Sequence, residues 1–128
     1  MGIVERRIQN NFDTVVIPEA LQKYNVEGVL DNIAFEINWA SFGPDRSSYE
    51  SIHLVWDQPL VGIEEVCCDA IGRDAIRGNI KKIVLHHVTS DNAIKAEFKD
   101  GVLTGYMNFA SGYSPGSTQF RTVLEDSL

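Results

Sequence analysis

Apolar residues recur at helical spacing in the N-terminal part of the chain. Val4, Ile8 and Phe12 are four residues apart and would lie on one side of a short helix over Val4–Phe12. Pro18 suits the first turn of a helix, because the backbone N–H that proline lacks has no intrahelical partner there. We therefore predict a second helix that begins near Pro18 and runs toward Asp31.

Two later segments alternate apolar and polar residues with the period of a strand. Residues 33–39 do so first, and residues 52–56 repeat the alternation before Pro59 ends the second strand. Residues 81–88 have a continuous apolar centre, which is typical of a central strand covered on both faces. The segment 41–48 between the first two strands contains glycine, proline, aspartate and serine, and it is predicted to be a loop.

From Ile63 onward the apolar spacing becomes helical again. Gly78 and Asn79 would then end this helix, since glycine and asparagine are common at helix C-termini. With residues 52–56 before it and residues 81–88 after it, the helix predicts a strand–helix–strand unit. Its crossover would be right-handed if the two strands are parallel.

The dipeptide Asp100–Gly101 lies between two alternating runs and predicts a hairpin with a tight two-residue turn. In this register Phe98 opposes Leu103 and Ala96 opposes Gly105 on an apolar face, while the other face is polar. Because a slip of one residue would exchange the two faces, the agreement supports this register.

Residues Gln119 to Leu124 are predicted to add a last short strand. Together the elements indicate the α+β class, a mixed, mostly antiparallel sheet of about five or six strands with helices packed on one face. The chain has 128 residues, of which 44% are hydrophobic and 23% charged, and this suits one folded α+β domain over 1–128.

Negative charge is concentrated in the first half of the chain. Eleven acidic and two basic side chains lie between Asp13 and Asp69, a net charge of −9, while the remainder carries +2. Folding does not require this segregation, so it favours a cationic partner. Nucleic-acid binding is disfavoured, because contacts to phosphate require clustered lysine and arginine.

Several classes of protein are excluded by what the sequence lacks. No apolar run approaches the roughly 18 residues of a membrane span, and the N-terminus has no basic-then-apolar signal, so we expect a cytoplasmic protein. The adjacent Cys67 and Cys68 do not face each other on a helix and have no second cluster of ligands, so we expect reduced thiols and no metal. No glycine-rich phosphate loop is present, and no cofactor is expected.

Histidines and one carboxylate supply the chemistry that an enzyme would use. His53 in the predicted strand over 52–56 and Asp57, which directly follows that strand, would lie on the same side. An imidazole near a carboxylate is suited to general-base catalysis. His86 and His87 point to opposite faces of their strand, so only one of them could join this pair. If the chain is an enzyme, the predicted catalytic residues are His53, Asp57 and His87.

The charge pattern leads to the principal functional hypothesis, a small acidic protein that docks on a basic protein partner, as an inhibitor of the immunity or antitoxin type would. Acidic side chains would steer the encounter and an aromatic side chain would anchor it. The predicted partner-binding residues are Glu19, Glu27, Asp31, Glu36, Phe42, Asp45, Tyr49 and Glu50. Two alternatives stay open: a small-molecule enzyme or ligand-binding domain with a His/Asp pocket, and a homo-oligomeric structural subunit.

Overall fold

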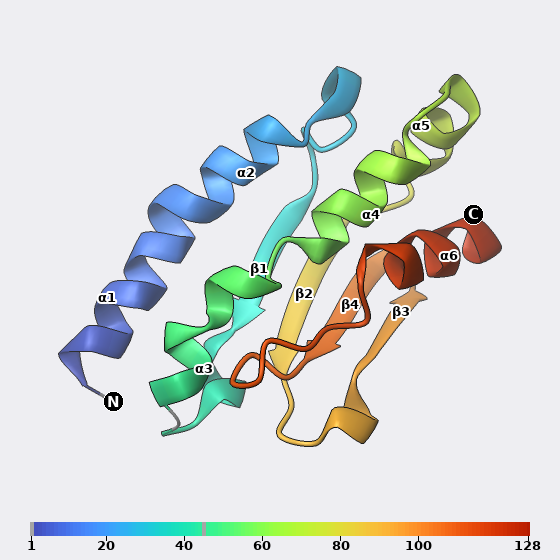
Figure 1. Ribbon diagram of the computed structural model, residues 1–128. Helices are drawn as coiled ribbons and strands as arrows, with labels where there is room; N and C mark the ends of the chain where they lie inside the picture. Colours follow the sequence, from blue (N-terminus) through green and yellow to red (C-terminus); the bar gives the residue numbers. More distant parts are fainter. Residues whose placement is uncertain (1, 45) are drawn as a thin grey trace.

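A mixed sheet with helices on one of its faces forms an α+β fold (Figure 1). The computed structural model of the chain describes residues 2–44 and 46–128. The strands are β1 (Ala34–Asn38), β2 (Lys82–His87), β3 (Lys95–Lys99) and β4 (Val102–Met107). The α-helices are α1 (Ile3–Asn11), α2 (Ile17–Lys23), α3 (Arg46–Glu50), α4 (Gln58–Val66), α5 (Ala70–Ile76) and α6 (Ser117–Ser127).

The strands follow the order β1-β2-β4-β3 in the sheet. The central strand β2 pairs in parallel with both β1 and β4, and β3 pairs antiparallel with β4. The α+β class and the helices on one face are as predicted. The predicted strand number and orientation are wrong, because the described chain has four strands and two of their three pairings are parallel.

One predicted strand is a helical turn. Ile52–Leu54 forms a 3-10 helix, and the N–H of Trp56 donates to the carbonyl of Ile52 at 3.3 Å. Ile52 and Trp56 are buried, but Leu54 between them is 56% exposed, so the alternating residues do not share a face. Pro59 therefore lies in the first turn of α4, a position that needs no N–H donor, and does not end a strand.

The last predicted strand is also helical. Phe120 and Leu124 in α6 are four residues apart and fully buried, which is the spacing of a helix face. This face packs on α4 at Gly62, where an added Cβ would lie 2.8 Å from the carbonyl of Ser117. The apolar pair was compatible with either element, and packing on α4 selects the helix.

The N-terminal helix continues through Pro18. A π-helical turn over Phe12–Val16 joins α1 to α2, and within it the N–H of Ile17 donates to the carbonyl of Phe12, five residues earlier. This wider turn shifts the pattern of backbone hydrogen bonds in the helix just before Pro18, which has no backbone N–H to donate. The expected second helix near Pro18 is thus a continuation of the first, and it ends at Lys23, well before Asp31.

The predicted long helix after Ile63 is divided into α4 and α5. The chain leaves α4 at Cys67, and the carboxylate of Asp69 accepts a hydrogen bond from the N–H of Gly72 to cap α5. A Cβ on Gly72 would lie only 1.7 Å from the carbonyl oxygen of Val66, so this junction needs glycine.

The hairpin of β3 and β4 has the predicted register. Phe98 pairs with Leu103 and Ala96 with Gly105, and Asp100 in the turn has a positive φ of 53°. The inner face of the sheet packs on the helices through Ile83, Leu85, Leu103 and Met107, which are fully buried. The opposite face carries Lys82, Glu36, His86, Tyr106 and their neighbours. In the described residues, no helix has the length and apolar character needed to cross a lipid bilayer.

Candidate functional site

A groove runs along the outer edge of β1. It has a volume of about 460 Å³ and is open to solvent. The lining residues come from the helix preceding the sheet, from β1 and from the turn after β1: Asp13, Ile17, Ala34, Phe35, Glu36, Ile37 and Trp39. Four of them are consecutive in β1, so the groove follows the strand. Its opposite wall is the π-helical turn and the start of α2, which contribute Asp13 and Ile17. Figure 1 shows the helix that contains them beside β1.

The backbone of β1 presents hydrogen-bonding groups to this groove. Ala34 donates its N–H to the carbonyl of Lys81, beside the first residue of β2. Because successive peptide groups of a strand point to opposite edges, Glu36 also faces β2, whereas the N–H and C=O groups of Phe35 and Ile37 face outward. Within the described chain, no strand pairs with this outer edge.

Asp13 and Trp39 close one end of the groove. The π-helical turn contains Asp13, whose two carboxylate oxygens accept from the indole Nε1–H of Trp39 at 3.1 and 3.2 Å. Trp39 is held in place by stacking on Tyr49, with ring centroids 6.0 Å apart. It also meets Phe12 edge-on at 6.1 Å. The indole is half-buried, so part of it is available to a bound group.

The groove is acidic. Of the described residues that line it, Asp13 and Glu36 are charged, and both are carboxylates. Glu36 forms an ion pair with Lys82 on the outer face of the sheet, with side chains 55% and 40% exposed. Exposed ion pairs of this kind contribute about 0–1 kcal/mol to the stability of a protein. The Glu36 carboxylate can therefore leave Lys82 and pair with another cation at a small cost in free energy.

Two of the predicted partner-binding residues are buried. Phe42 and Tyr49 are each 2% exposed and belong to the aromatic cluster around Trp39. The assumption that these two side chains are exposed to a partner is therefore wrong. Their aromatic rings pack on each other and on Trp39, and Phe42 also stacks on Phe109. Their apolar area is removed from water by folding and not by binding.

Basic residues of the second half partly neutralise the acidic first half. Glu27 pairs with Arg73 at 2.7 Å and lies 4.0 Å from Arg77. Glu36 and Glu65 also form ion pairs, so among the described residues three of the eleven acidic side chains between 13 and 69 are paired with bases from the second half. The segregation seen along the sequence is thus reduced in space, but not removed.

The remaining predicted acidic residues are dispersed. Glu19 is exposed on α2 and Glu50 is exposed at the end of α3. Asp31 accepts a hydrogen bond from Asn25 Nδ2 at 2.7 Å. Asp45 lies outside the described residues. Among the members of the predicted set that the structure describes, Glu36 alone lines the β1 groove.

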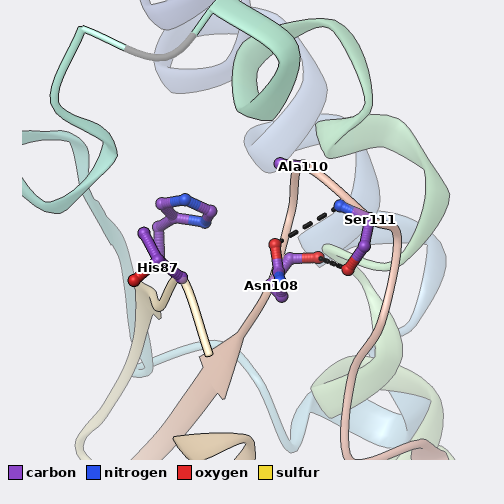
Figure 2. Close-up of a pocket in the computed structure, with 5 residues that line it drawn as sticks. His87, Asn108, Ala110 and Ser111 are labelled. Carbon is purple, nitrogen blue, oxygen red and sulfur yellow. Dashed lines mark hydrogen bonds between the residues drawn. The ribbon is translucent and has the colours of Figure 1, made fainter. Parts of the chain in front are cut away.

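A second, smaller pocket of about 250 Å³ lies at the carboxyl ends of β2 and β4, the end of a parallel sheet where ligands commonly bind. Its lining residues are His87, Thr89, Asn108, Ala110 and Ser111. Figure 2 shows His87 on β2 and the hydrogen-bonded Asn108 and Ser111 on the segment after β4. The His87 Nδ1 accepts from the N–H of Phe109 at 3.2 Å, so a neutral imidazole carries its proton on Nε2.

The predicted catalytic residues lie on three different elements. His87 lines this second pocket, but His53 is exposed on the 3-10 turn and neither His53 nor Asp57 is among the lining residues. Asp57 instead accepts a hydrogen bond from the hydroxyl of Tyr24 at 3.1 Å. Since residues 52–56 are not a strand, the alternation that brought His53 and Asp57 to one side does not apply.

The cysteines and other metal ligands show no gathered site. Cys67 is buried and Cys68 exposed, and both are free thiols. Burial raises the pKa of Cys67, which disfavours a thiolate there. In residues 2–44 and 46–128, no group of three or more histidine, cysteine, aspartate or glutamate side chains is arranged to hold a metal ion.

The sequence did not single out the β1 groove. In the sequence, Asp13 contributes only to the charge total, and Trp39 is an aromatic residue at the end of a predicted strand, beside the predicted loop over 41–48. The feature that gives both residues significance is the position of β1 at the sheet edge, and strand order leaves no local signal in the sequence. Comparisons of the chain with protein families, with curated proteins and with solved structures found no match.

Proposed function

We propose that this chain is an acidic binding protein that docks on a basic protein partner through the groove beside β1. The observation that carries the proposal is the charge of that groove: Asp13 and Glu36 are its charged lining residues, and both are acidic. An inhibitor of the immunity or antitoxin type is the kind of protein for which this mode of docking is expected.

Two properties of the groove and the net charge of the whole chain support the proposal. The groove volume of about 460 Å³ lies within the range of about 300–1,000 Å³ found for binding pockets. Trp39 supplies an aromatic surface at one end, and tryptophan is enriched among residues that dominate binding energy. The net charge of −7 would also speed the encounter with a cation.

The test compares two double variants that change the net charge equally. D13N/E36Q removes both groove carboxylates. E97Q/D126N removes one exposed carboxylate from the opposite edge strand and one from α6. Glu97 is a close match for Glu36, because it lies in the same row of the sheet and also pairs with a lysine.

Each protein is immobilised and exposed to extract of the host cells at about 50 and about 300 mM salt, which span weak and strong screening. A retained protein is identified by mass spectrometry, purified and titrated against all three chains. We expect a basic partner whose affinity falls about tenfold or more for D13N/E36Q and at high salt, and little for E97Q/D126N. Equal loss for the two variants would show that net charge, and not the groove, determines binding.

The pocket at the carboxyl ends of β2 and β4 supports a second candidate function, binding of a small polar molecule. The imidazole of His87, the carboxamide of Asn108 and the hydroxyl groups of Thr89 and Ser111 line it. Screening of small polar metabolites by ligand-observed NMR, with S111A as the comparison variant, tests it. A molecule that binds both proteins equally would place its site elsewhere.

A further inference from the structure

We propose that the partner contributes an extended segment with lysine or arginine side chains, which adds to the outer edge of β1 as a further strand of the sheet. This inference rests on the proposed function and specifies how the same groove is used. It follows from the backbone of β1, from the shape of the groove and from the difference between the two edges of the sheet.

The first argument is the hydrogen-bonding capacity of the β1 edge. The peptide groups of Phe35 and Ile37 face away from β2, and none of the described turn, loop or cap hydrogen bonds involves them. An outward row of N–H and C=O groups is a template for another strand, and main-chain hydrogen bonds then supply affinity with little dependence on sequence.

The second argument is the shape of the groove. It follows four consecutive residues of β1, from Ala34 to Ile37, and the helix with Asp13 and Ile17 forms its other wall. A space that follows a strand over this length suits an extended chain better than a globular or planar ligand. Trp39 marks the end at which β1 turns into the 3-10 helix Trp39–Phe42.

The third argument is the contrast between the edges. At the opposite edge, β3 carries Lys95 and Lys99 on its outer face, and lysine on an edge strand is a common device against pairing with another chain. The sequence of β1 is Ala-Phe-Glu-Ile-Asn, which contains neither lysine nor proline. The β1 edge is therefore the one left open to strand addition.

Charge then selects the occupant. Side chains of an added strand would alternate between the outer face of the sheet and the face covered by helices. Glu36 lies on the outer face, in the row with Val84 and Thr104, whereas Asp13 comes from the helix side. A segment with basic side chains at neighbouring positions would meet a carboxylate on either side, while an acidic segment would be repelled.

The test uses a defined probe, a blocked peptide about seven residues long in which pairs of adjacent lysines are separated by single valines. Its length matches an ordinary strand, and in a strand its lysines face both sides. Two analogues separate the contribution of backbone hydrogen bonds from the contribution of charge. In one, alternate backbone amides are N-methylated, which removes strand hydrogen bonds and keeps the charge. In the other, glutamate replaces lysine. Binding is measured by fluorescence anisotropy with the native chain, D13N/E36Q and E97Q/D126N, and by amide hydrogen exchange in NMR.

We expect the lysine peptide to bind the native chain and E97Q/D126N about equally, and the N-methylated and glutamate analogues to bind at least about tenfold more weakly. On saturation, exchange of the Phe35 and Ile37 amides should slow by about tenfold or more. The Glu36 amide faces β2 in the free protein, so its exchange should stay unchanged.

Failure of the two proposals is distinguishable. If the lysine peptide does not bind, or binds D13N/E36Q as tightly as E97Q/D126N, both the groove function and strand addition are wrong. If binding depends on Asp13 and Glu36 but the N-methylated analogue binds equally well and Phe35 and Ile37 gain no protection, strand addition is wrong and the charged groove stands.

Discussion

Substitution of Gly105 by alanine is expected to destabilise the protein by overpacking the centre of the sheet. Gly105 lies in β4 on the face covered by α6. An added Cβ would lie 2.8 Å from Cζ of Phe120, 3.0 Å from Cε of Met107 and 3.1 Å from Cδ2 of Leu85. Non-bonded carbons prefer about 3.5–4.0 Å, so the Phe120 ring must retreat by about 0.7 Å. Overpacking of this degree costs about 1–3 kcal/mol.

If overpacking against Phe120 causes the loss of stability in G105A, a smaller residue at position 120 should restore part of it. F120L removes the atom nearest the new Cβ, and on its own it costs about 1–2 kcal/mol because it leaves a void. In G105A/F120L the methyl group occupies part of that void. The double variant should therefore be more stable than the sum of the two single effects predicts, by about 1 kcal/mol.

Urea unfolding followed by circular dichroism gives the free energy of unfolding for the four proteins of this cycle. The control pairs G105A with I76V, a change at a fully buried residue of α5, and additivity within about 0.5 kcal/mol is expected there. Additive effects for G105A and F120L would refute the contact between the Phe120 ring and β4. They would also weaken the assignment of α6 as the helix that covers this part of the sheet.

Three further predictions concern titration and reactivity. The hydrogen bond from Arg46 lowers the pKa of Glu5. The stability that the ionised Glu5 contributes is therefore present above about pH 4.5 and is lost as pH falls through the lowered pKa. E5Q should flatten the acid side of the plot of Tm against pH. Burial raises the pKa of Tyr24. The stability that the neutral Tyr24 contributes is therefore present below about pH 10 and is lost as pH rises through the raised pKa. Y24F should show a smaller fall in Tm at alkaline pH than the native chain. Iodoacetamide should label Cys68 in the folded protein and Cys67 only in denaturant, as read by mass spectrometry.

The elements that the sequence predicted correctly depend on near neighbours in the chain. The Asp100–Gly101 turn needs positive φ at its two central residues, and alternation on both sides of it determines the β3–β4 register. The apolar run of β2 likewise predicted a central strand, and β2 is central in the sheet. The expected cover on both of its faces is wrong, because burial alternates along β2 and helices cover one face. The turn, the register and the strand itself survive in any fold that keeps the local geometry, so pattern alone was sufficient for them.

The errors occur where one pattern fits two structures. The alternation of Ile52, Leu54 and Trp56 fits a strand, but the spacing of four between Ile52 and Trp56 also fits a helix. In the structure both residues are buried on a helical turn and Leu54 is exposed. Phe120 and Leu124 were ambiguous in the same way, and the close approach of Gly62 in α4 made room for a helix. In short segments, burial against a distant element decides between periods of 2 and 3.6.

By itself, the sequence determined the fold class, the hairpin, the central strand and the excess of negative charge, because periodicity and composition are local properties. Only the tertiary structure decided which strand lies at the sheet edge, which carboxylates meet a base and which aromatic side chains are buried. Phe42 and Tyr49 became core residues and Glu27 met Arg73 through contacts between segments far apart in the chain. The groove beside β1 was also decided by the tertiary structure, because a strand lies at the sheet edge only as a result of how all the strands pair.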